Sequence, residues 1–280
     1  MAPVRRKGAA ISHSSDSNIV TNSGHKLSER VSRRLPALWH FIVQRFKHGE
    51  RYGLDFTIAF VAIVAAMWGF LAIIEAAVTE AELYELDSRI QTIMASILTP
   101  AVTDYMVFIT NIGGTRGTVI GAVAVGLLLL FTRRWWSLFG LVFATAGGGI
   151  IIWGLKVFFQ RARPVETVID AGGYAFPSGH AFAAMVFFGY LIHLAFRHFR
   201  LHGLQILVTL VGTAMVLLIG SSRVYLNVHW LTDVVGGWIA GFAWLLISIL
   251  IVRHIEWPKR GLTLPSDEKY EPSEDDAGRA

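Results

Sequence analysis

The sequence predicts an all-α, polytopic membrane protein: a bundle of six transmembrane helices with one further helix at the membrane surface. Apolar residues make up 54% of the 280-residue chain and charged residues only 16%, whereas a soluble protein carries about a quarter charged residues. Several apolar runs approach or exceed the roughly 20 residues that cross a bilayer as a helix. Basic and tryptophan residues gather at the ends of these runs, as is typical of membrane–water interfaces.

The composition also excludes some classes of function. The chain has no cysteine, which rules out disulfides, thiolate catalysis and cysteine-ligated metal sites. Its formal net charge is +5, but the basic residues lie beside the predicted spans. We therefore expect the lipid bilayer, and not nucleic acid, as their partner. The first fifty residues are polar and lack the short apolar core of a cleavable signal peptide.

Three regions follow from the shifts in composition. Residues 1–50 are basic and rich in serine, and we expect a mostly disordered cytoplasmic segment. Within it, Pro36–Phe46 has the pattern of a short interfacial helix, although a solvated tail is the favoured interpretation. Residues 51–255 form the predicted membrane domain. Residues 256–280 contain prolines and acids and form a predicted disordered tail.

The apolar runs place the six predicted spans in order along the chain. We expect them at Leu54–Val78, Thr118–Phe131, Leu138–Phe159, Ala181–Phe196, Leu204–Gly220 and Trp230–Val252. The run Ile90–Ile109 is also apolar, but Pro100 and Asp104 interrupt it, so we predict a helix on the membrane surface there. The glycines at positions 147–149, 237 and 241 are typical of close helix–helix contacts.

The basic loops predict the orientation of the spans. Loops rich in Lys and Arg stay in the cytoplasm. This places both termini there, together with the turn at Arg133 and Arg134 and the turn from Arg197 to His202. The loop after the third span also carries basic residues, yet six spans place it outside. A bound anionic ligand would explain why this outer loop keeps them.

Three short polar clusters separate the long apolar runs. They are Lys156–Pro164, Phe176–His180 and Ser222–Asp233. Charged groups are costly inside a bilayer, so charges that persist at the ends of apolar runs are candidates for function. The predicted topology brings all three clusters to the outer face. Together they supply cations, two histidines, a carboxylate and a Ser-Gly turn, a set that suits a bound phosphate.

The second cluster ends in Ser178, Gly179 and His180, directly before an apolar helix. Ser178 is expected to cap the helix N-terminus, and Gly179 lets the backbone approach a ligand closely. The N–H groups at a helix N-terminus bind anions readily, and His180 would stand at that site. Taken alone, the motif fits an ordinary capped helix with an interfacial histidine equally well.

In the third cluster, His229 and Asp233 are four residues apart, so they share one face of a helix. A carboxylate on one imidazole nitrogen fixes the tautomer and leaves the other nitrogen as a nucleophile. The alternative is a capping aspartate beside an unrelated histidine. Three basic residues are placed to reach the same pocket, although each by itself is most often an interface anchor whose charge extends to water. They are Lys156, Arg163 and Arg223.

These residues stand in the order and spacing of the type 2 phosphatidic acid phosphatase family, which the chain resembles from about Leu54 to Val252. The family pattern begins with a lysine, six residues and Arg-Pro. It continues with Pro-Ser-Gly-His and ends with Ser-Arg, five residues, His, three residues and Asp. The matching residues here are Lys156, Arg163, Pro164, Pro177, Ser178, Gly179, His180, Ser222, Arg223, His229 and Asp233.

The resemblance implies a role for each of the polar matches. His229 would be the nucleophile that takes the phosphoryl group, Asp233 its orienting partner, and His180 the general acid and then the base. The phosphate would be held by Lys156, Arg163, Ser178, Gly179 and Arg223. Cations and N–H groups can stabilise a transferring phosphoryl group by themselves, so we expect neither a metal ion nor another cofactor.

The resemblance also implies a membrane lipid phosphatase that acts through a phosphohistidine. The predicted topology places the site at the outer face, and the short loops without an Asn-x-Ser/Thr site favour a bacterial inner membrane. Undecaprenyl diphosphate is the substrate we favour. Phosphatidylglycerol phosphate, phosphatidic acid and lipid A phosphates are the alternatives, because the motifs contact the phosphate and not the tail. Two other classes remain open: a phosphotransferase that moves the group to an alcohol, and a transporter of phosphate-bearing molecules. The charges gather at one face and not at the midplane, which disfavours the transporter.

Overall fold

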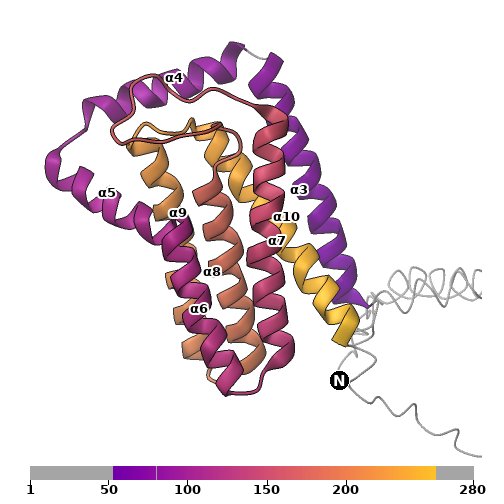
Figure 1. Ribbon diagram of the computed structural model, residues 1–280. Coiled ribbons are helices and arrows are strands. Elements are labelled where there is room, and N and C mark those ends of the chain that lie inside the picture. Colours follow the sequence, from indigo (N-terminus) through magenta and orange to yellow (C-terminus); the bar gives the residue numbers. More distant parts are fainter. Residues whose placement is uncertain (1–52, 80, 257–280) are drawn as a thin grey trace, which may run out of the picture. The chain divides into compact units, whose positions relative to one another are not determined.

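The structure is a computed structural model that describes residues 53–79 and 81–256. All regular secondary structure in these ranges is helical (Figure 1). The helices are α3 (Leu54–Thr79), α4 (Ala81–Ser96), α5 (Pro100–Gly113), α6 (Thr115–Phe131), α7 (Trp135–Phe159), α8 (Gly179–His198), α9 (His202–Tyr225) and α10 (Leu231–Glu256). The predicted N-terminal segment, the interfacial helix considered at 36–46 and the predicted tail beyond Glu256 lie outside the described residues. The chain divides into two compact units between Ile58 and Ala59, and the contacts discussed below belong to the second unit.

Five of the described helices are long and apolar enough to cross a membrane, namely α3, α7, α8, α9 and α10. Helices α5 and α6 meet at an angle of 51° and together qualify as a sixth span. The chain is a multi-pass membrane protein. The prediction of an all-α, polytopic membrane fold is therefore confirmed, and the number of spans is six when the bent pair α5–α6 is counted as one.

The region between the first two predicted spans differs from the prediction. We expected one surface helix over Ile90–Ile109, but the chain forms α4 and α5, which are separated at residues 97–99. Pro100 explains the break, because proline lacks a backbone N–H and disfavours helical geometry in the residue before it. It stands instead in the first turn of α5. The second predicted span begins at Thr115, and α5 leads into it through the bend at Gly114.

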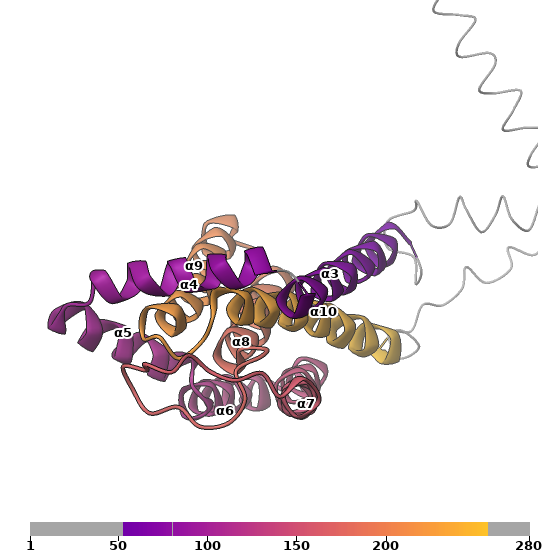
Figure 2. The ribbon, with the colours of Figure 1, turned by 90° about the horizontal axis from the view of Figure 1, so that it is seen from above.

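Helix α8 is the most enclosed of the candidate spans. Seen from above, it lies among α7, α9 and α10 (Figure 2), and it packs against all three. Of its most apolar window, 44% is buried, against 22% for α7 and α9 and 39% for α10. Phe182, Val186 and Tyr190 of α8 belong to the main apolar core. This packing fixes the position of the N-terminus of α8, where the predicted phosphate-binding turn lies.

Small residues let α10 pack directly on the backbone of α8. A Cβ atom at Gly237 would lie 2.6 Å from the carbonyl oxygen of Ser178, and one at Gly241 would lie 2.9 Å from that of Phe182. Gly148 of α7 similarly leaves room for the ring of Phe182. The predicted packing role of these three glycines is confirmed. The contact at Ser178 also brings the beginnings of α8 and α10 together.

The loop from α7 to α8 crosses the end of the bundle where α9 meets α10 (Figure 1). The Val168 N–H donates to the carbonyl of Leu226 at 3.0 Å, and the Ser178 N–H donates to the carbonyl of Asp233 at 2.9 Å. These bonds hold the loop and the α9–α10 turn together. The α6–α7 and α8–α9 turns lie at the opposite end (Figure 1).

Candidate active site

The three predicted polar clusters converge on one cavity. Lys156 and Arg223 lie in the last turns of α7 and α9, Gly179 opens α8, and Asp233 lies in the first turn of α10. The cavity has a volume of about 1030 Å³. Its charged end is lined by Lys156, Arg163, Gly179, His180, Arg223 and His229. Helix ends and the loops beside them thus bring together residues that are up to 73 positions apart in the sequence.

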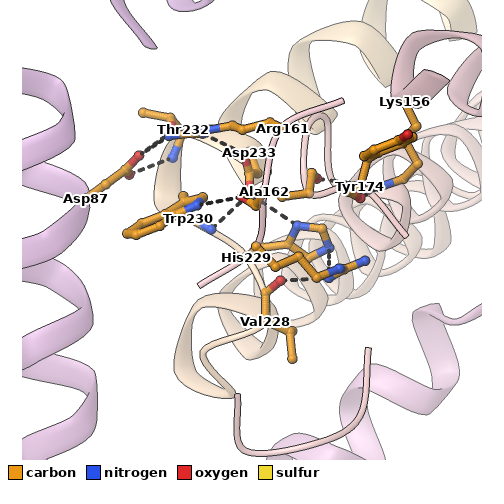
Figure 3. A network of polar contacts seen from close by, with 12 residues as sticks. Asp87, Lys156, Arg161, Ala162, Tyr174, Val228, His229, Trp230, Thr232 and Asp233 are labelled. Carbon is orange, nitrogen blue, oxygen red and sulfur yellow. Dashed lines mark hydrogen bonds and ion pairs between the residues drawn. The ribbon is translucent and has the colours of Figure 1, made fainter. Parts of the chain in front are cut away.

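His229 is held between a carboxylate and a guanidinium. Its Nδ1 lies 3.3 Å from Oδ2 of Asp233 (Figure 3), and its Nε2 lies 3.3 Å from Nη1 of Arg163. A guanidinium only donates hydrogen bonds, so Nε2 accepts and the ring proton is on Nδ1, which donates to Asp233. The lone pair of the imidazole is therefore on Nε2, the nitrogen nearer to the cations.

The surroundings keep His229 neutral. Burial, followed by the positive charges of Arg163, Arg223 and Lys156, holds the pKa of His229 well below its usual range. Folded His229 therefore resists protonation as the pH falls through about 6.5, where an unfolded histidine takes up a proton. An unprotonated imidazole keeps the lone pair that nucleophilic attack requires.

Asp233 contacts more than the histidine. Its Oδ2 also accepts the backbone N–H of Trp230 at 3.0 Å, and its Oδ1 accepts Nη1 of Arg161 at 2.6 Å (Figure 3). Trp230 directly precedes α10, and an acid three residues further on that binds this N–H has the geometry of a capping box. The two interpretations of Asp233 from the sequence are therefore compatible, because the same carboxylate caps α10 and holds His229.

Arg163 is oriented by backbone carbonyl groups. Its guanidinium donates to Gly172 at 2.9 Å, to Gly173 at 3.0 Å and to Val228 at 2.7 Å. Gly173 has a φ of 73°, a conformation that favours glycine. Carbonyl groups are neutral, so they fix the guanidinium without cancelling its charge. Burial lowers the pKa of Arg163, and a bound anion would act in the opposite direction.

Lys156 is placed in a similar way. Its Nζ donates to the carbonyl oxygen of Tyr174 at 2.5 Å and lies 3.4 Å from that of Ala175 (Figure 3). A Cβ atom built on Gly179 would lie 3.6 Å from Cε of Lys156, so the lysine runs along the beginning of α8. Both cations are thus fixed by neutral groups beside the helix N-terminus, where an anion is stabilised.

Arg223 and Ser178 carry buried polar atoms that have no hydrogen-bond partner among the described residues. These atoms are Nε of Arg223 and Oγ of Ser178. Arg223 is only 4% exposed, and its Nη1 donates to Oγ1 of Thr110 at 2.7 Å. Buried polar groups in native proteins are nearly always paired. A phosphate at the charged end of the cavity would offer acceptors to both atoms.

The expected side-chain cap of α8 is not formed. Ser178 stands at the predicted N-cap position, but its hydroxyl makes no capping hydrogen bond. The start of the helix is fixed instead by backbone contacts, since the Ser178 N–H donates to Asp233 and the Ser178 carbonyl accepts the N–H of Phe182 at 3.0 Å. The serine hydroxyl therefore makes no hydrogen bond with any described residue.

His180 lines the cavity beside the bend between α5 and α6. A Cβ atom at Gly114 would lie 3.3 Å from Nε2 of His180, so a residue without a side chain faces the imidazole. Among the described residues, no carboxylate pairs with His180, whereas His229 is paired with Asp233. The described ranges also contain no group of three or more His, Asp or Glu side chains that could hold a metal ion.

Away from the charged end, the cavity is apolar. It continues along α6 and α7, where its lining includes Val119, Val123, Leu127, Val142 and Trp153. Gly149 also lines it and has no atom within 4 Å of its Cβ position. A cavity that is cationic at one end and apolar along the rest matches an amphiphile with an anionic head and a hydrocarbon tail.

Comparison with known protein families agrees with this geometry. The profile of the PAP2 superfamily matches residues 137–257, a range that contains all three polar clusters. The chain belongs to the PAP2 superfamily. It is a membrane lipid phosphatase of this metal-independent family.

Individual PAP2 relatives extend the match beyond the family profile. The chain is 29% identical over 195 residues to phosphatidylglycerophosphatase B of Bacillus subtilis (strain 168). The aligned region covers 68% of this chain and 94% of the relative. The crystal structure of a transmembrane PAP2-type phosphatidylglycerolphosphate phosphatase from Bacillus subtilis has a TM-score of 0.64 at 23% identity, covering 72% of this chain and 98% of that one. That likeness shows the PAP2 transmembrane fold. The crystal structure of Aquifex aeolicus LpxE is less similar, with a TM-score of 0.48 at 22% identity, covering 59% of this chain and 94% of that one.

All eight residues assigned to the PAP2 site from the sequence lie together in the structure. Six of them line the cavity. The other two, Ser178 and Asp233, are fully buried and do not line the cavity. The structure thus brings together the residues to which the sequence assigned roles, and those roles are taken up as proposals below.

Sequence reasoning missed three residues that hold the PAP2 site in place. Thr110 of α5 orients Arg223. Arg161 is one of the basic residues in the loop after the third span, but its guanidinium pairs with Asp233 and with Asp87 of α4. Asp87 lies in an acidic stretch between the first two spans and has no motif around it. No local signal separates it from its acidic neighbours, because its partners lie more than 70 residues away.

Proposed function

We propose that this PAP2 phosphatase hydrolyses the terminal phosphate of a membrane lipid phosphate or diphosphate through a phosphohistidine on His229. The observation that supports this most directly is the orientation of the His229 ring. Its Nδ1 is occupied by Asp233, while Nε2 faces the charged end of the cavity beside Arg163. A phosphate held by the surrounding cations would present its phosphorus atom to this lone pair.

In the first step, Nε2 of His229 attacks phosphorus and the bond from phosphorus to the leaving oxygen breaks. Protonated His180 donates its proton to that oxygen, so the dephosphorylated lipid leaves as an alcohol or as a shorter phosphate. Asp233 stabilises the imidazolium that forms on His229, because it accepts the Nδ1 proton throughout. Lys156, Arg163, Arg223, the Ser178 hydroxyl and the Gly179 N–H stabilise the charge on the phosphoryl oxygens.

In the second step, water attacks the phosphorus of the phosphohistidine. His180, now neutral, takes a proton from the water, and the bond between phosphorus and nitrogen breaks. Inorganic phosphate is released and His229 returns to its starting tautomer. The chemistry uses His180 twice in opposite directions, first as the acid and then as the base.

The apolar part of the cavity supports a lipid as the substrate. Because it adjoins the cationic end along α6 and α7, the phosphate and the tail of one molecule would be bound together. Undecaprenyl diphosphate fits this arrangement and is the substrate favoured from the sequence. Similarity to phosphatidylglycerophosphatase B makes phosphatidylglycerol phosphate an equally strong candidate substrate. Phosphatidic acid and lipid A phosphates have the same combination of head and tail.

A lipid panel tests the proposal. The purified protein is incubated with undecaprenyl diphosphate, phosphatidylglycerol phosphate, phosphatidic acid and a lipid A phosphate, in excess chelator, and free phosphate is measured. We expect phosphate release from at least one lipid with a long tail, and inhibition by vanadate, which mimics the phosphate in transfer. Phosphate that appears only on an added alcohol would identify a phosphotransferase. Binding without any turnover would identify a transporter or binding protein and contradict the proposal.

A further inference from the structure

A second polar network lies behind the nucleophile, on the side away from the cavity. It consists of Asp87 from α4, Arg161 from the α7–α8 loop, and Thr232 and Asp233 from the first turn of α10 (Figure 3). Asp87 is 1% exposed and Asp233 is 0% exposed. Two buried carboxylates so close to one another are costly unless a cation and hydrogen bonds compensate them, so their arrangement calls for a physical explanation.

Arg161 joins the two carboxylates. Its Nη1 lies 2.6 Å from Oδ1 of Asp233, and its Nη2 lies 3.0 Å from Oδ2 of Asp87. Its Nη1 also donates to Oγ1 of Thr232 at 2.7 Å. The guanidinium lies 5.6 Å from the ring centroid of Trp230. The planar fork of arginine suits such a bridge, because its nitrogens are rigidly spaced and always charged.

Asp87 in turn fixes Arg161 to the start of α10. Its carboxylate accepts the Thr232 hydroxyl at 2.5 Å and the Thr232 backbone N–H at 3.1 Å, in addition to Arg161. The unpaired N–H groups of a helix N-terminus favour a carboxylate at this point. A side chain from α4 thereby caps α10, the helix that carries the partner of the nucleophile.

The two oxygens of Asp233 are divided between different tasks. Oδ1 binds Arg161, whereas Oδ2 binds Nδ1 of His229 and the N–H of Trp230. Rotation of the carboxylate would exchange these partners. Arg161 opposes that rotation because it binds Oδ1 from a direction fixed by Asp87. The orientation of the His229 ring therefore depends on residues that never reach the cavity.

We propose that Asp87 and Arg161 are positioning residues for the reaction. Asp87 holds Arg161, Arg161 holds the Asp233 carboxylate, and Asp233 keeps the Nε2 lone pair of His229 directed at phosphorus. This inference rests on the proposed role of His229 as the nucleophile. It makes α4 a part of the active site and not merely a connection between spans.

Arg161 could instead bind the phosphate itself, like Arg163 two residues later. The structure disfavours that role, because Arg161 does not line the cavity and both of its terminal nitrogens are engaged by carboxylates. The two roles differ in kinetics. A phosphate ligand contributes to binding of substrate and of vanadate, whereas a positioning residue acts on the rate of the chemical step.

The experiment compares Asp87→Asn, Arg161→Gln and the milder Thr232→Val in the full-length protein. We expect Asp87→Asn and Arg161→Gln to lower kcat about 10- to 100-fold, as misplacement of a reacting group does. The KM for the lipid and the inhibition constant of vanadate should each stay within about threefold of the wild-type values, because the cavity lining is unchanged. Thr232→Val, which removes no charge, should lower kcat in the same direction by a smaller factor.

A double-mutant cycle tests the route through Asp233. If Asp87 acts through that carboxylate, adding Asp87→Asn to Asp233→Asn should lower kcat by less than about threefold further, because the effects of coupled residues are not additive. If the two substitutions acted independently, the kcat of the double variant would fall by the product of the two single effects. That result would overturn the proposal. A phosphate-binding role for Arg161, seen as a raised KM and weaker vanadate inhibition at unchanged kcat, would overturn it as well.

The chain offers a matched control at the other end of α10. Arg197 and Glu256 form a similar ion pair, with distances of 2.5 and 2.7 Å between Nη2 and the two carboxylate oxygens. Glu256→Gln should lower the unfolding temperature but leave kcat unchanged. An equal loss of kcat in Glu256→Gln and Asp87→Asn would mean that Asp87 acts only on stability, and the positioning role would be wrong. A failure of the proposed function can be distinguished from a failure of this inference. If His229 were not the nucleophile, a phosphoenzyme would still form in His229→Ala.

Discussion

At the scale of single residues, the tautomer of His229 follows from a neighbour that can only donate hydrogen bonds. Arg163 has no acceptor to offer, so its contact with His229 assigns the imidazole tautomer without any observation of hydrogens. Asp233 completes the assignment on the other nitrogen. The two contacts support the proposal that this histidine, and not His180, attacks phosphorus. They also specify what each histidine should do when the other is removed.

The roles proposed for His229 and His180 predict different amounts of phosphoenzyme when each histidine is replaced. His229→Ala should form none, because the attacking nitrogen is gone. His180→Ala should still be phosphorylated by a substrate with a good leaving group, and the phosphoenzyme should accumulate because no base activates the water. Labelled phosphate on the protein, stable in alkali and labile in acid, is the measurement. If His180→Ala remained unlabelled and His229→Ala became labelled, the two roles would have to be exchanged.

Arg223→Lys tests the contribution of one fixed cation. Lysine keeps the positive charge but loses the planar fork and the buried Nε–H that lacks a partner among the described residues. We expect kcat to fall about 100- to 1000-fold, the usual effect of removing one donor that stabilises a transition state. The unfolding temperature should change little. Arg200→Lys, an exposed substitution far from the site, is the control. Near-normal turnover of Arg223→Lys would show that Arg223 does not contact the phosphate.

At the scale of elements, two features of the helices shape the cavity. The bend between α5 and α6 brings Gly114 to His180 and Thr110 to Arg223. Helix α7 carries a run of three glycines in which two pack against neighbouring side chains, whereas Gly149 faces the apolar part of the cavity. The same sequence feature thus serves packing on one side of the helix and substrate space on the other.

Filling this space should separate long-tailed from soluble substrates. Gly149→Phe places a ring in the apolar part of the cavity and replaces a poor helix former. Position 149 lies 31 residues before His180 in the chain. We expect the KM for a lipid phosphate with a long tail to rise about 10-fold or more. Hydrolysis of a short, water-soluble phosphomonoester should be unchanged. Both are measured by release of phosphate.

Gly154→Phe provides the matched control for this substitution. Gly154 also lies in α7 with no atom within 4 Å of its Cβ position, but it does not line the cavity. The same ring at this position should therefore leave both substrates unaffected. Equal effects of the two substitutions on the lipid substrate would show that the tail is bound elsewhere.

At the scale of the whole molecule, the spans place the site at one membrane face. The charged end of the cavity lies at the end of the bundle crossed by the α7–α8 loop, and the basic α6–α7 and α8–α9 turns lie at the other end (Figure 1). Because basic loops stay in the cytoplasm, we propose that the site opens to the outer face of a bacterial inner membrane. Both termini would then be cytoplasmic.

Reporter fusions test this orientation. A reporter joined after Trp257 should be active in the cytoplasm, and one inserted within residues 165–173 should be active outside, because an odd number of spans separates the two points. A reporter after Arg134 serves as an independent cytoplasmic control. The opposite pattern would move the site to the inner face and contradict the proposed access to lipids of the outer leaflet.

The spans and the residue types that meet at the site could be predicted from the amino-acid sequence. Crossing a bilayer requires a long apolar run, which is a property of consecutive residues, so five spans were predicted to within a few residues. The residue types at the site were also readable, because phosphate binding and nucleophilic attack each need particular side chains at particular spacings. Lys156, His180 and His229 were found in this way.

Which contacts each of two similar residues makes was visible only in the tertiary structure. Arg161 and Arg163 are of one type and two positions apart, yet Arg163 meets the cavity while Arg161 turns to two carboxylates. The difference arises from the path of the α7–α8 loop and from Asp87, which reaches Arg161 from another helix. Likewise, the break at Pro100 could be suspected locally, but only packing showed that α5 brings Thr110 to Arg223. Contacts across long sequence separations depend on the folded arrangement of the helices, and no local pattern encodes them.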